Sequence, residues 1–522
     1  MTSSELPTFS GGAPQPVLTR ADRRFRWWLG IGVALLSLLT LAAIVVTNGN
    51  IVVGLAPSIL VLIVYAVAKL PLRYPVMLIF AVIFTLDTPA EPFAGGKYQS
   101  PLHLVSELLT AQLKHVIPGS GLIFTGLDLF IVGAFLLHGY RRATRSKLDR
   151  DDYTPTPIPL LVTAWVCLAG IVMAWMLGLA TGGSFRFSLW QVQRNLYLPL
   201  MFLLFQAAFP SPRQFKPYFA LLIVIACLRS VMALWLREQF PLEEYATSHS
   251  DSMLFGTVTC LVVIRLMHGT ARRERFRLVL VLLLLIVGMV ENDRRLVWVQ
   301  IAVALGFVFV MTPWSNFKVK LIRRVLFSLP VVLAYLAAGW NSSSSVFAPV
   351  ATIRSMVDSK SDGSTLWRDL ENFNLVMTFR RAPLTGTGFG HPFDMVQPMP
   401  DITAHYELEP YVPHNSVVGL WAYTGYVGFT MLWMILLVGC YLSARTFYVA
   451  REKDDRTAAL TTFCALVIYM LHCYGDMGLG SWVAICLICP LLALVGKLAV
   501  KTGAWSWSGS RRRSAAPAAS PS

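Results

Sequence analysis

Apolar runs recur along almost the whole chain and are separated by shorter polar segments. An α-helix needs ~20 apolar residues to cross a hydrocarbon core of about 30 Å, and many of the runs approach that length. We predict about 14 membrane-spanning helices, near residues 29–47, 51–68, 75–86, 122–138, 158–180, 196–209, 218–236, 253–267, 278–290, 296–312, 325–339, 416–439, 458–472 and 480–499. The predicted fold is therefore all-α, a polytopic transmembrane helical bundle.

The composition agrees with this pattern. Hydrophobic residues make up 55% of the 522 residues and charged residues only 14%. Ordinary water-soluble domains need more polar surface than this to cover their apolar atoms, so that class is excluded. The eight cysteines lie mostly within the apolar runs, which predicts buried thiols.

Basic residues are distributed unevenly over the predicted loops. If the amino terminus is cytoplasmic, most of the 44 Lys and Arg residues fall in inner loops and tails, and acidic residues predominate in the outer loops. This arrangement satisfies the positive-inside rule. The net charge of +16 therefore reports topology and contact with anionic membrane lipids, and we expect no nucleic-acid partner.

The same patterns divide the chain into five regions. We predict a cytoplasmic basic tail (1–28), a transmembrane region with about 11 spans (29–339), a long extracytoplasmic loop (340–415), a transmembrane region with about 3 spans (416–499) and a cytoplasmic disordered tail (500–522). Because the longest loops face outward, we expect the chemistry on the extracytoplasmic side.

Apolar residues repeat at helical spacing within the long loop, at Leu366, Leu370, Phe373 and Met377. This spacing predicts an amphipathic helix that packs against the protein, lies on the outer membrane surface or roofs a cavity. Arg380 and Arg381 stand at its end, directly before a turn-rich segment. They are candidates for contact with an anionic ligand.

Three motifs follow one another between residues 383 and 428. The first is Pro383-Leu384-Thr385-Gly386-Thr387-Gly388-Phe389-Gly390, whose glycines, Gly386 and Gly388 among them, allow a close approach of the backbone to a ligand. The second and third are Pro413-His414-Asn415-Ser416, where an apolar run begins, and Tyr423-Thr424-Gly425-Tyr426-Val427-Gly428 within that run. In this order the motifs resemble the O-antigen ligase and polymerase superfamily of bacterial membrane glycosyltransferases.

The resemblance implies a helical membrane fold of the glycosyltransferase C type in the bacterial inner membrane, with its active site facing the periplasm. Such enzymes take a glycan from an undecaprenyl diphosphate carrier and transfer it to another glycan, to a lipid-linked glycan or, in some relatives, to a protein. The implied function is a glycan ligase or polymerase in cell-surface polysaccharide biosynthesis. Its expected partners are that donor, the acceptor glycan, membrane lipids and other polysaccharide assembly proteins.

Arginine residues on the predicted outer face are candidates for binding the donor diphosphate. Asp293-Arg294-Arg295 opens a predicted span and resembles the arginine-bearing element of the superfamily, in which Ser-Arg-Gly is more usual. Arg186 and Arg194 lie in a short predicted outer loop, 181–195, before the predicted span 196–209, and a planar guanidinium suits phosphate oxygens. The alternative for all of these arginines is local ion pairing and snorkelling at the membrane interface.

His414 is the candidate general base, because a glycosyl acceptor hydroxyl must lose its proton as it attacks the anomeric carbon. Asn415 is expected to fix the backbone or the ring tautomer, and Glu409 to orient His414 or to bind a sugar hydroxyl. The alternative for His414 is a structural hydrogen bond at the start of the span. We expect no cofactor and no catalytic metal, because the acidic run Asp149-Arg150-Asp151-Asp152 falls in a predicted cytoplasmic loop.

A lipid-linked glycan flippase or exporter is the competing class of function, and a scaffold subunit of a polysaccharide assembly complex is a further one. An exporter predicts charges along a path through many spans. The charges predicted within spans are essentially Asp128 and Arg229, which favours the enzyme.

Overall fold

The computed structural model describes residues 20–46, 58, 61–65, 67–86, 109, 124–144, 153–239, 247–314, 316–342, 344–347, 350, 353–354, 363–401, 408–476 and 478–506. The chain divides into two compact units, Met1–Pro71 and Leu72–Ser522. The described part of the first unit contains α1 (Arg20–Val46). The predicted span 51–68 and the predicted loop 87–121 lie largely outside the described residues.

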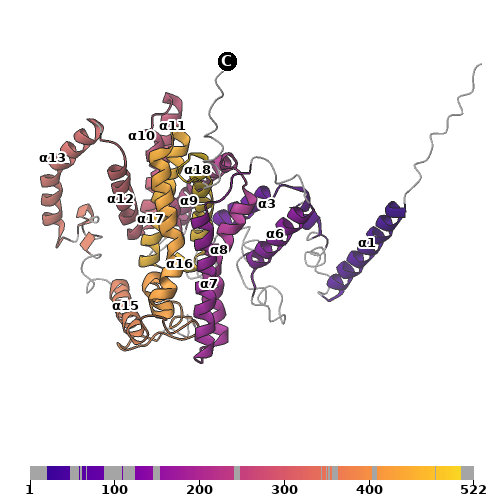
Figure 1. The fold of residues 1–522 in the computed structure, drawn as a ribbon. Coiled ribbons are helices and arrows are strands. Elements are labelled where there is room, and N and C mark those ends of the chain that lie inside the picture. The colour runs from indigo at the N-terminus through magenta and orange to yellow at the C-terminus, as the bar shows by residue number, and fades with distance from the viewer. Residues whose placement is uncertain are drawn as a thin grey trace, which may run out of the picture. The chain divides into compact units, whose positions relative to one another are not determined.

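The regular secondary structure in the described parts of the second unit is helical, and these parts include no β-strand (Figure 1). Its α-helices are α3 (Arg73–Leu86), α6 (Gly126–Ala143), α7 (Ile158–Ala180), α8 (Phe185–Ala208), α9 (Lys216–Gln239), α10 (Asp251–Met267), α11 (Arg272–Asn292), α12 (Arg295–Met311), α13 (Asn316–Gly339), α15 (Gly363–Arg381), α16 (Ser416–Val449), α17 (Lys453–Gly475) and α18 (Trp482–Lys501). The described residues also form the short 3₁₀ turns η2 (Pro212–Phe215), η3 (Ser345–Phe347) and η5 (Gly478–Gly480). The all-helical prediction is therefore correct for the described residues.

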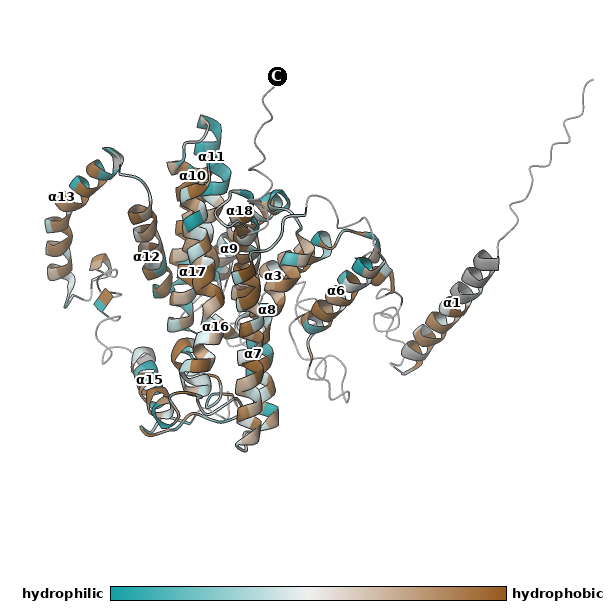
Figure 2. Ribbon diagram, viewed as in Figure 1, coloured by the Kyte–Doolittle hydropathy of each residue, from teal (hydrophilic) through white to brown (hydrophobic). Residues whose placement is uncertain are grey.

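Among the described residues, six helical segments are long and apolar enough to cross a membrane, and they contain all or most of α7, α9, α13, α16, α17 and α18. Three shorter apolar helices cover Gly30–Leu41, Arg73–Thr85 and Arg295–Met311. The chain is thus a multi-pass membrane protein, but the predicted number of about 14 spans is not confirmed. Figure 2 shows hydrophobic residues along α12 and α18 and hydrophilic residues at one end of α11.

The core of the second unit forms around α18. In the most apolar stretch of this helix, 94% of the residues are buried, and α8, α16 and α17 pack against the helix. Helix α16 also packs along α7, and α17 packs against α10 and α12. Because neighbouring helices surround α18, it is the central helix of the second unit, and α8, α16 and α17 are positioned by packing against it.

Helix α16 is broken at Gly425, whose backbone is non-helical (φ 61°, ψ −170°). Residues 383–390 lie across the break and bond to both of its sides. Four hydrogen bonds of 2.8–3.1 Å run from the N–H groups of Thr387, Gly388, Tyr426 and Val427 to the carbonyl oxygens of Ala422, Tyr423, Pro383 and Leu384. Because a break within a membrane helix exposes backbone groups that must find partners, this segment makes the break tolerable.

Helix α15 forms within the predicted long loop, as its apolar spacing predicts, but the face that it buries is a different one. Leu366 and Phe373 of the predicted apolar stripe are 48% and 38% exposed. The fully buried residues instead follow one another at the spacing i, i+3, i+4 and i+7, and they are Glu371, Asn374, Leu375 and Thr378. Helix α15 therefore turns a largely polar face toward the protein.

That polar face holds the returning chain. The Asn374 side chain exchanges hydrogen bonds with the backbone of Gln397, and Thr378 Oγ1 accepts from the Asp394 N–H at 2.8 Å. Leu375 packs in a small core with Phe393, Val418 and Ala422. These contacts fix the segment that leads from α15 back to α16.

Candidate functional site

His414 lies directly before α16 and is held by Glu371 of α15. The Glu371 carboxylate accepts hydrogen bonds from the His414 backbone N–H at 3.1 and 3.2 Å, and its Oε1 lies 3.1 Å from the ring Nδ1. Glu371 is fully buried, whereas the His414 side chain is 31% exposed. When Nδ1 donates to the carboxylate, the lone pair of Nε2 is the basic position of the ring.

The pKa of His414 is raised above its ordinary value of 6.5. Burial alone lowers this pKa, but the hydrogen bond and the negative charge of Glu371 outweigh it, with a further contribution from Asp476. The arrangement therefore stabilises a positive charge on the imidazole, as a group that receives a proton requires.

Glu409 lies in the segment that precedes His414 and is almost completely buried. Neither of its carboxylate oxygens has a hydrogen-bond partner among the described residues. Burial raises its pKa, and the negative charge of Glu371 raises it further. A second buried carboxyl group thus stands within electrostatic range of the Glu371–His414 pair.

Asn415 is the N-cap of α16. Its side-chain Oδ1 accepts hydrogen bonds from the N–H groups of Val417 and Val418, both at 3.1 Å. Next to it, Ser416 donates to the Asp476 carbonyl oxygen at 3.2 Å. The start of α16 is therefore fixed directly after His414, and Asn415 acts on the backbone rather than on the ring.

A small cleft of about 60 Å³ lies beside this helix start. Pro413 and Ser416 line it from the His414 side, and Trp190 and Arg194 line it from α8. The Arg194 guanidinium lies 5.2 Å from the Trp190 ring centroid, and its Nη1 donates to the Gly480 carbonyl oxygen at 3.3 Å. The structure thus brings Arg194 to the same cleft as the residues on both sides of His414-Asn415.

Arg186 lies at the exposed start of α8. Its guanidinium is 5.6 Å from the Phe187 ring centroid, and Phe187 stacks on Tyr411 at 4.0 Å. Helix α8 begins at Phe185, so the segment 181–195, predicted as an outer loop before a span at 196–209, is mostly helical. Arg186 and Arg194 are therefore two turns apart on one helix face rather than on a flexible loop.

Arg294 and Arg295 lie at the junction of α11 and α12, Arg294 as the N-cap and Arg295 as the first residue of α12. Asp293 ends α11 in a left-handed conformation (φ 48°). The acidic residues of this turn form their salt bridges with Arg237 of α9, at 3.8 Å from Glu291 and 3.9 Å from Asp293.

The same turn is tied to the neighbouring chain ends. Asn292 Oδ1 accepts hydrogen bonds from Thr247 N–H and Oγ1 at 3.0 and 2.9 Å. Leu296 is packed against Gly475 at the end of α17, close to Asp476. Arg294 and Arg295 therefore stand at the end of the bundle that carries Asp476 and the start of α16.

Arg380 and Arg381 lie at the other end of α15 from its first turns, nine residues or more beyond Glu371. The Arg381 Nη1 atom forms a salt bridge with Asp394 Oδ1 at 2.6 Å, and Arg380 contacts the Met377 sulfur. At a rise of about 1.5 Å per residue, Arg380 is displaced by roughly 13 Å along the helix from Glu371. The observed role of Arg381 is to hold the returning loop.

Gly386 and Gly388 both have positive φ angles, and both touch protein backbone. A Cβ atom on Gly386 would lie 2.3 Å from the Tyr423 carbonyl carbon, and one on Gly388 would lie 2.2 Å from the Gly178 nitrogen of α7. The sequence predicted that the backbone at these glycines would lie close to a ligand. In the structure, it lies close to the backbones of α7 and α16 instead.

The predicted outer segments gather at one end of the second unit. His249 Nδ1 lies 2.5 Å from Asp476 Oδ2, and Ser250 and Ser481 hydroxyls lie 2.6 Å apart. Together with the contacts of Arg194, Asn292 and Ser416, these bonds join the chain near the starts of α10, α12, α16 and α18. No group of three or more metal-ligating side chains occurs in the parts of the chain that the structure describes.

Residues 280–433 match the family model described as O-Antigen ligase. This part of the chain is similar to the O-antigen ligase family. The resemblance to the O-antigen ligase and polymerase superfamily is thereby confirmed, and a glycosyltransferase-type activity is supported. The matched segment includes α12, α15 and the first part of α16, with Arg294, Glu371 and His414. No curated protein matches the chain.

Sequence reasoning does not single out Glu371. An acidic residue on an amphipathic helix is normally expected on the solvated face, and nothing local marks it as buried. The available signal is its polar companions Asn374 and Thr378, which share its face at helical spacing. The segment that matches the O-antigen ligase model thus contains a carboxylate–histidine pair that only the folded chain reveals.

Proposed function

We propose that this protein is a membrane glycosyltransferase that transfers or polymerises a glycan from an undecaprenyl-diphosphate-linked donor on the extracytoplasmic face of the bacterial inner membrane. The observation that carries the proposal is the pairing of His414 with buried Glu371 inside the matched O-antigen ligase domain. A histidine whose one ring nitrogen is bound to a carboxylate is oriented for proton transfer at the other.

In the proposed reaction, His414 Nε2 takes the proton of the acceptor hydroxyl while that oxygen attacks the anomeric carbon. The new glycosidic C–O bond forms as the bond to the diphosphate breaks, and the lipid diphosphate leaves with the bonding electron pair. Glu371 holds the Nδ1 proton and stabilises the imidazolium that results.

The departing diphosphate needs compensation for its negative charge, for which we propose Arg194 together with Arg294 or Arg295. Arg194 lines the cleft beside the α16 start, and the α11–α12 turn is attached to the same end of the bundle. Guanidinium groups bind phosphate oxygens through two parallel hydrogen bonds. In this proposal the protein supplies the charge compensation without a metal.

The test uses full-length protein purified in lipid, a defined lipid-linked donor and a glycan acceptor. His414→Ala should lower transfer by on the order of 10²–10⁴ while donor binding persists. The matched control is His391→Gln, since His391 stands in the same returning segment and hydrogen-bonds to Thr181 at 2.8 Å. This control should transfer glycan at a near-normal rate.

His414→Gln separates a base from a structural hydrogen bond, because glutamine can keep the hydrogen bond but cannot accept the proton at neutral pH. Near-normal transfer by this variant would exclude His414 as the base and direct attention to Glu409. An exporter would bind donor but produce no transfer product in the purified system, which would reject the enzymatic proposal as a whole.

A further inference from the structure

A second cavity, of about 590 Å³, lies at the opposite end of α17 and α18 from His414. It is bounded by η2 and α9, by the end of α10, by the first turn of α17 and by the last turns of α18. Helix α17 has 23 residues, which corresponds to a separation of roughly 30 Å between its two ends. The cavity is therefore independent of the proposed glycosyl-transfer site.

The inner wall of this cavity is apolar. Phe215 and Phe219 contribute from the η2–α9 segment, Leu261 from α10, and Leu494 and Leu498 from α18. Phe215 and Phe219 lie in the apolar helical segment Pro212–Glu238, and Leu494 and Leu498 lie in the apolar segment Trp482–Lys501. A ligand that fills the cavity must accordingly bring apolar surface to this wall.

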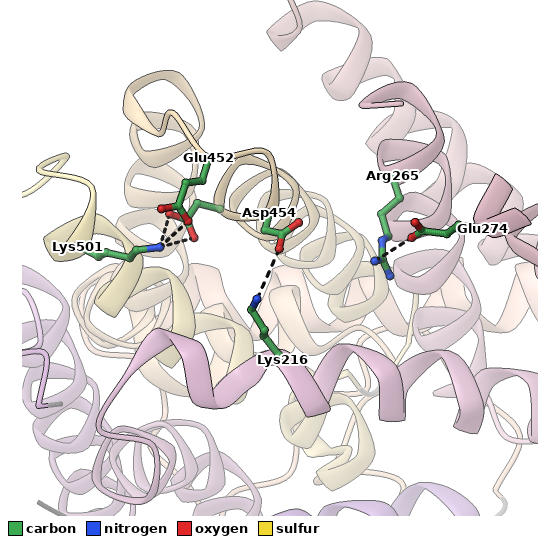
Figure 3. A network of polar contacts seen from close by, with 7 residues as sticks. Lys216, Arg265, Glu274, Glu452, Asp454 and Lys501 are labelled. Carbon is green, nitrogen blue, oxygen red and sulfur yellow. Dashed lines mark hydrogen bonds and ion pairs between the residues drawn. The ribbon is translucent and has the colours of Figure 1, made fainter. Parts of the chain in front are cut away.

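The rim of the cavity carries charges of both signs (Figure 3). Two of the basic residues are held firmly by neighbouring acids. Lys501 Nζ lies 2.8–3.0 Å from carboxylate oxygens of Glu452 and Asp455, and Arg265 lies 3.1 Å from Glu274. These pairs form the fixed frame of the rim.

Lys216 and Asp454 make a looser pair on the same rim. Their charged atoms are 3.7 Å apart, and their side chains are 74% and 79% exposed. Arg213, also at the rim, forms no salt bridge within the described residues. An exposed pair of this kind contributes little to stability, so a ligand can replace it at small cost.

We propose that this cavity binds the headgroup of a phospholipid that carries both a phosphate and a primary amine, as phosphatidylethanolamine does. The phosphate meets Arg213 and Lys216, and the ammonium group meets Asp454 in place of Lys216. The part of the acyl chains nearest the headgroup lies against the wall of phenylalanine and leucine side chains. An anionic lipid without an amine would face the Asp454 carboxylate with nothing to compensate it, so charge complementarity favours the zwitterion.

The ammonium group distinguishes this lipid from one with a choline headgroup. A primary ammonium donates three hydrogen bonds to carboxylate oxygens, whereas a trimethylated nitrogen donates none. Binding of phosphatidylethanolamine should therefore be roughly three- to tenfold tighter than binding of phosphatidylcholine with the same acyl chains. Binding of phosphatidylglycerol should also be weaker, by a similar factor.

The experiment measures lipid binding to the delipidated full-length protein by native mass spectrometry, with the three lipids at matched chain length. Asp454→Asn should abolish the preference for the ethanolamine lipid over the choline lipid. The double variant Arg213→Gln/Lys216→Gln should weaken both lipids alike and keep the preference. Arg445→Gln is the matched control, since Arg445 lies at the same end on α16 outside the cavity and contacts Tyr441.

Three outcomes would overturn the proposal. The first is equal or tighter binding of phosphatidylglycerol or phosphatidylcholine to the unmodified protein. The second is an Asp454→Asn variant that keeps the full preference for ethanolamine. The third is soluble phosphoethanolamine that binds as tightly as the lipid, because the apolar wall would then contribute nothing.

Discussion

The carboxylate of Glu371 accepts hydrogen bonds from both the backbone N–H and the ring Nδ1 of His414, although 43 residues separate the two positions. The double attachment fixes the ring tautomer and the position of the backbone at the same time. Glu371 is fully buried and His414 is partly exposed. In the proposed reaction, the proton is therefore taken at Nε2, the ring nitrogen that does not face the carboxylate.

The first prediction concerns the pH dependence of transfer. A general base acts when it is unprotonated, and the pKa of His414 is raised above 6.5. The rate should therefore rise with pH through a midpoint above 6.5 in the unmodified protein. Glu371→Gln removes the group that raises this pKa, so burial should shift the midpoint to lower pH.

The plateau rate of Glu371→Gln should fall roughly tenfold or more, but by less than the ~10²–10⁴ of removing the base itself. The measurement is kcat of the purified protein across a pH series. Asp394→Asn, which alters the carboxylate bound to Arg381, is a control that should keep the original midpoint. An unshifted midpoint in Glu371→Gln would mean that the observed titration belongs to another group.

The second prediction concerns the diphosphate. Arg194→Lys keeps the positive charge but loses the planar fork, so donor binding should weaken by about tenfold. The corresponding change at Arg445, at the opposite end of α16, should have no effect on donor affinity. Equal donor affinity in the two variants, measured with a lipid diphosphate, would show that Arg194 serves only to hold α8 against Gly480.

The third prediction concerns the segment that lies across the broken helix. Gly388→Ala places a Cβ atom against the Gly178 backbone, so the apparent melting temperature of the purified protein should fall sharply. Gly182 has a similar positive φ of 89° but open space around it. Gly182→Ala should therefore cost only the backbone strain, about 1–2 kcal/mol. Equal melting temperatures of the Gly388→Ala and Gly182→Ala variants would argue against tight packing between Gly388 and α7.

The fourth prediction concerns a buried ion pair between α9 and α10. Arg229 and Asp251 are almost fully buried, with charged atoms 2.8 Å apart. Asp251→Asn leaves the guanidinium without its counter-charge and should destabilise the fold by about 3–5 kcal/mol. The double variant Arg229→Leu/Asp251→Asn should recover part of that loss in thermal melting. A double variant less stable than the single one would contradict this interpretation.

The fifth prediction concerns topology. Leu384 and Tyr153 are 65% and 69% exposed, and they lie in segments predicted for opposite sides of the membrane. In a background without reactive native thiols, Leu384→Cys should react with an impermeant reagent that has reached the periplasm. Tyr153→Cys should react only after the inner membrane is opened. The reverse pattern would place the His414 end of the protein in the cytoplasm.

The apolar periodicity of the chain determined its class and the position of most helices. Residues 158–180 are predicted as a span and form α7 with the same limits, because a long apolar run has only the helix available in a membrane. The start of α8 was predicted less well than α7. The polar residues around Arg186 and Arg194 have the composition of a loop, but in the structure they form the first turns of α8. Polar residues can extend a helix wherever neighbouring segments satisfy them.

The motif residues were also visible in the sequence, but their partners were not. The sequence determined only that Gly386, Gly388 and Gly425 belong to glycine-bearing motifs, in which the backbone can adopt conformations that other residues rarely reach. Only the tertiary structure decided that the segment around Gly386 packs against the backbone at the break in α16, and that buried Glu371 contacts His414. Both contacts join segments that are far apart in the chain. A local sequence pattern does not specify which distant segment packs against it, because that depends on how the whole chain folds.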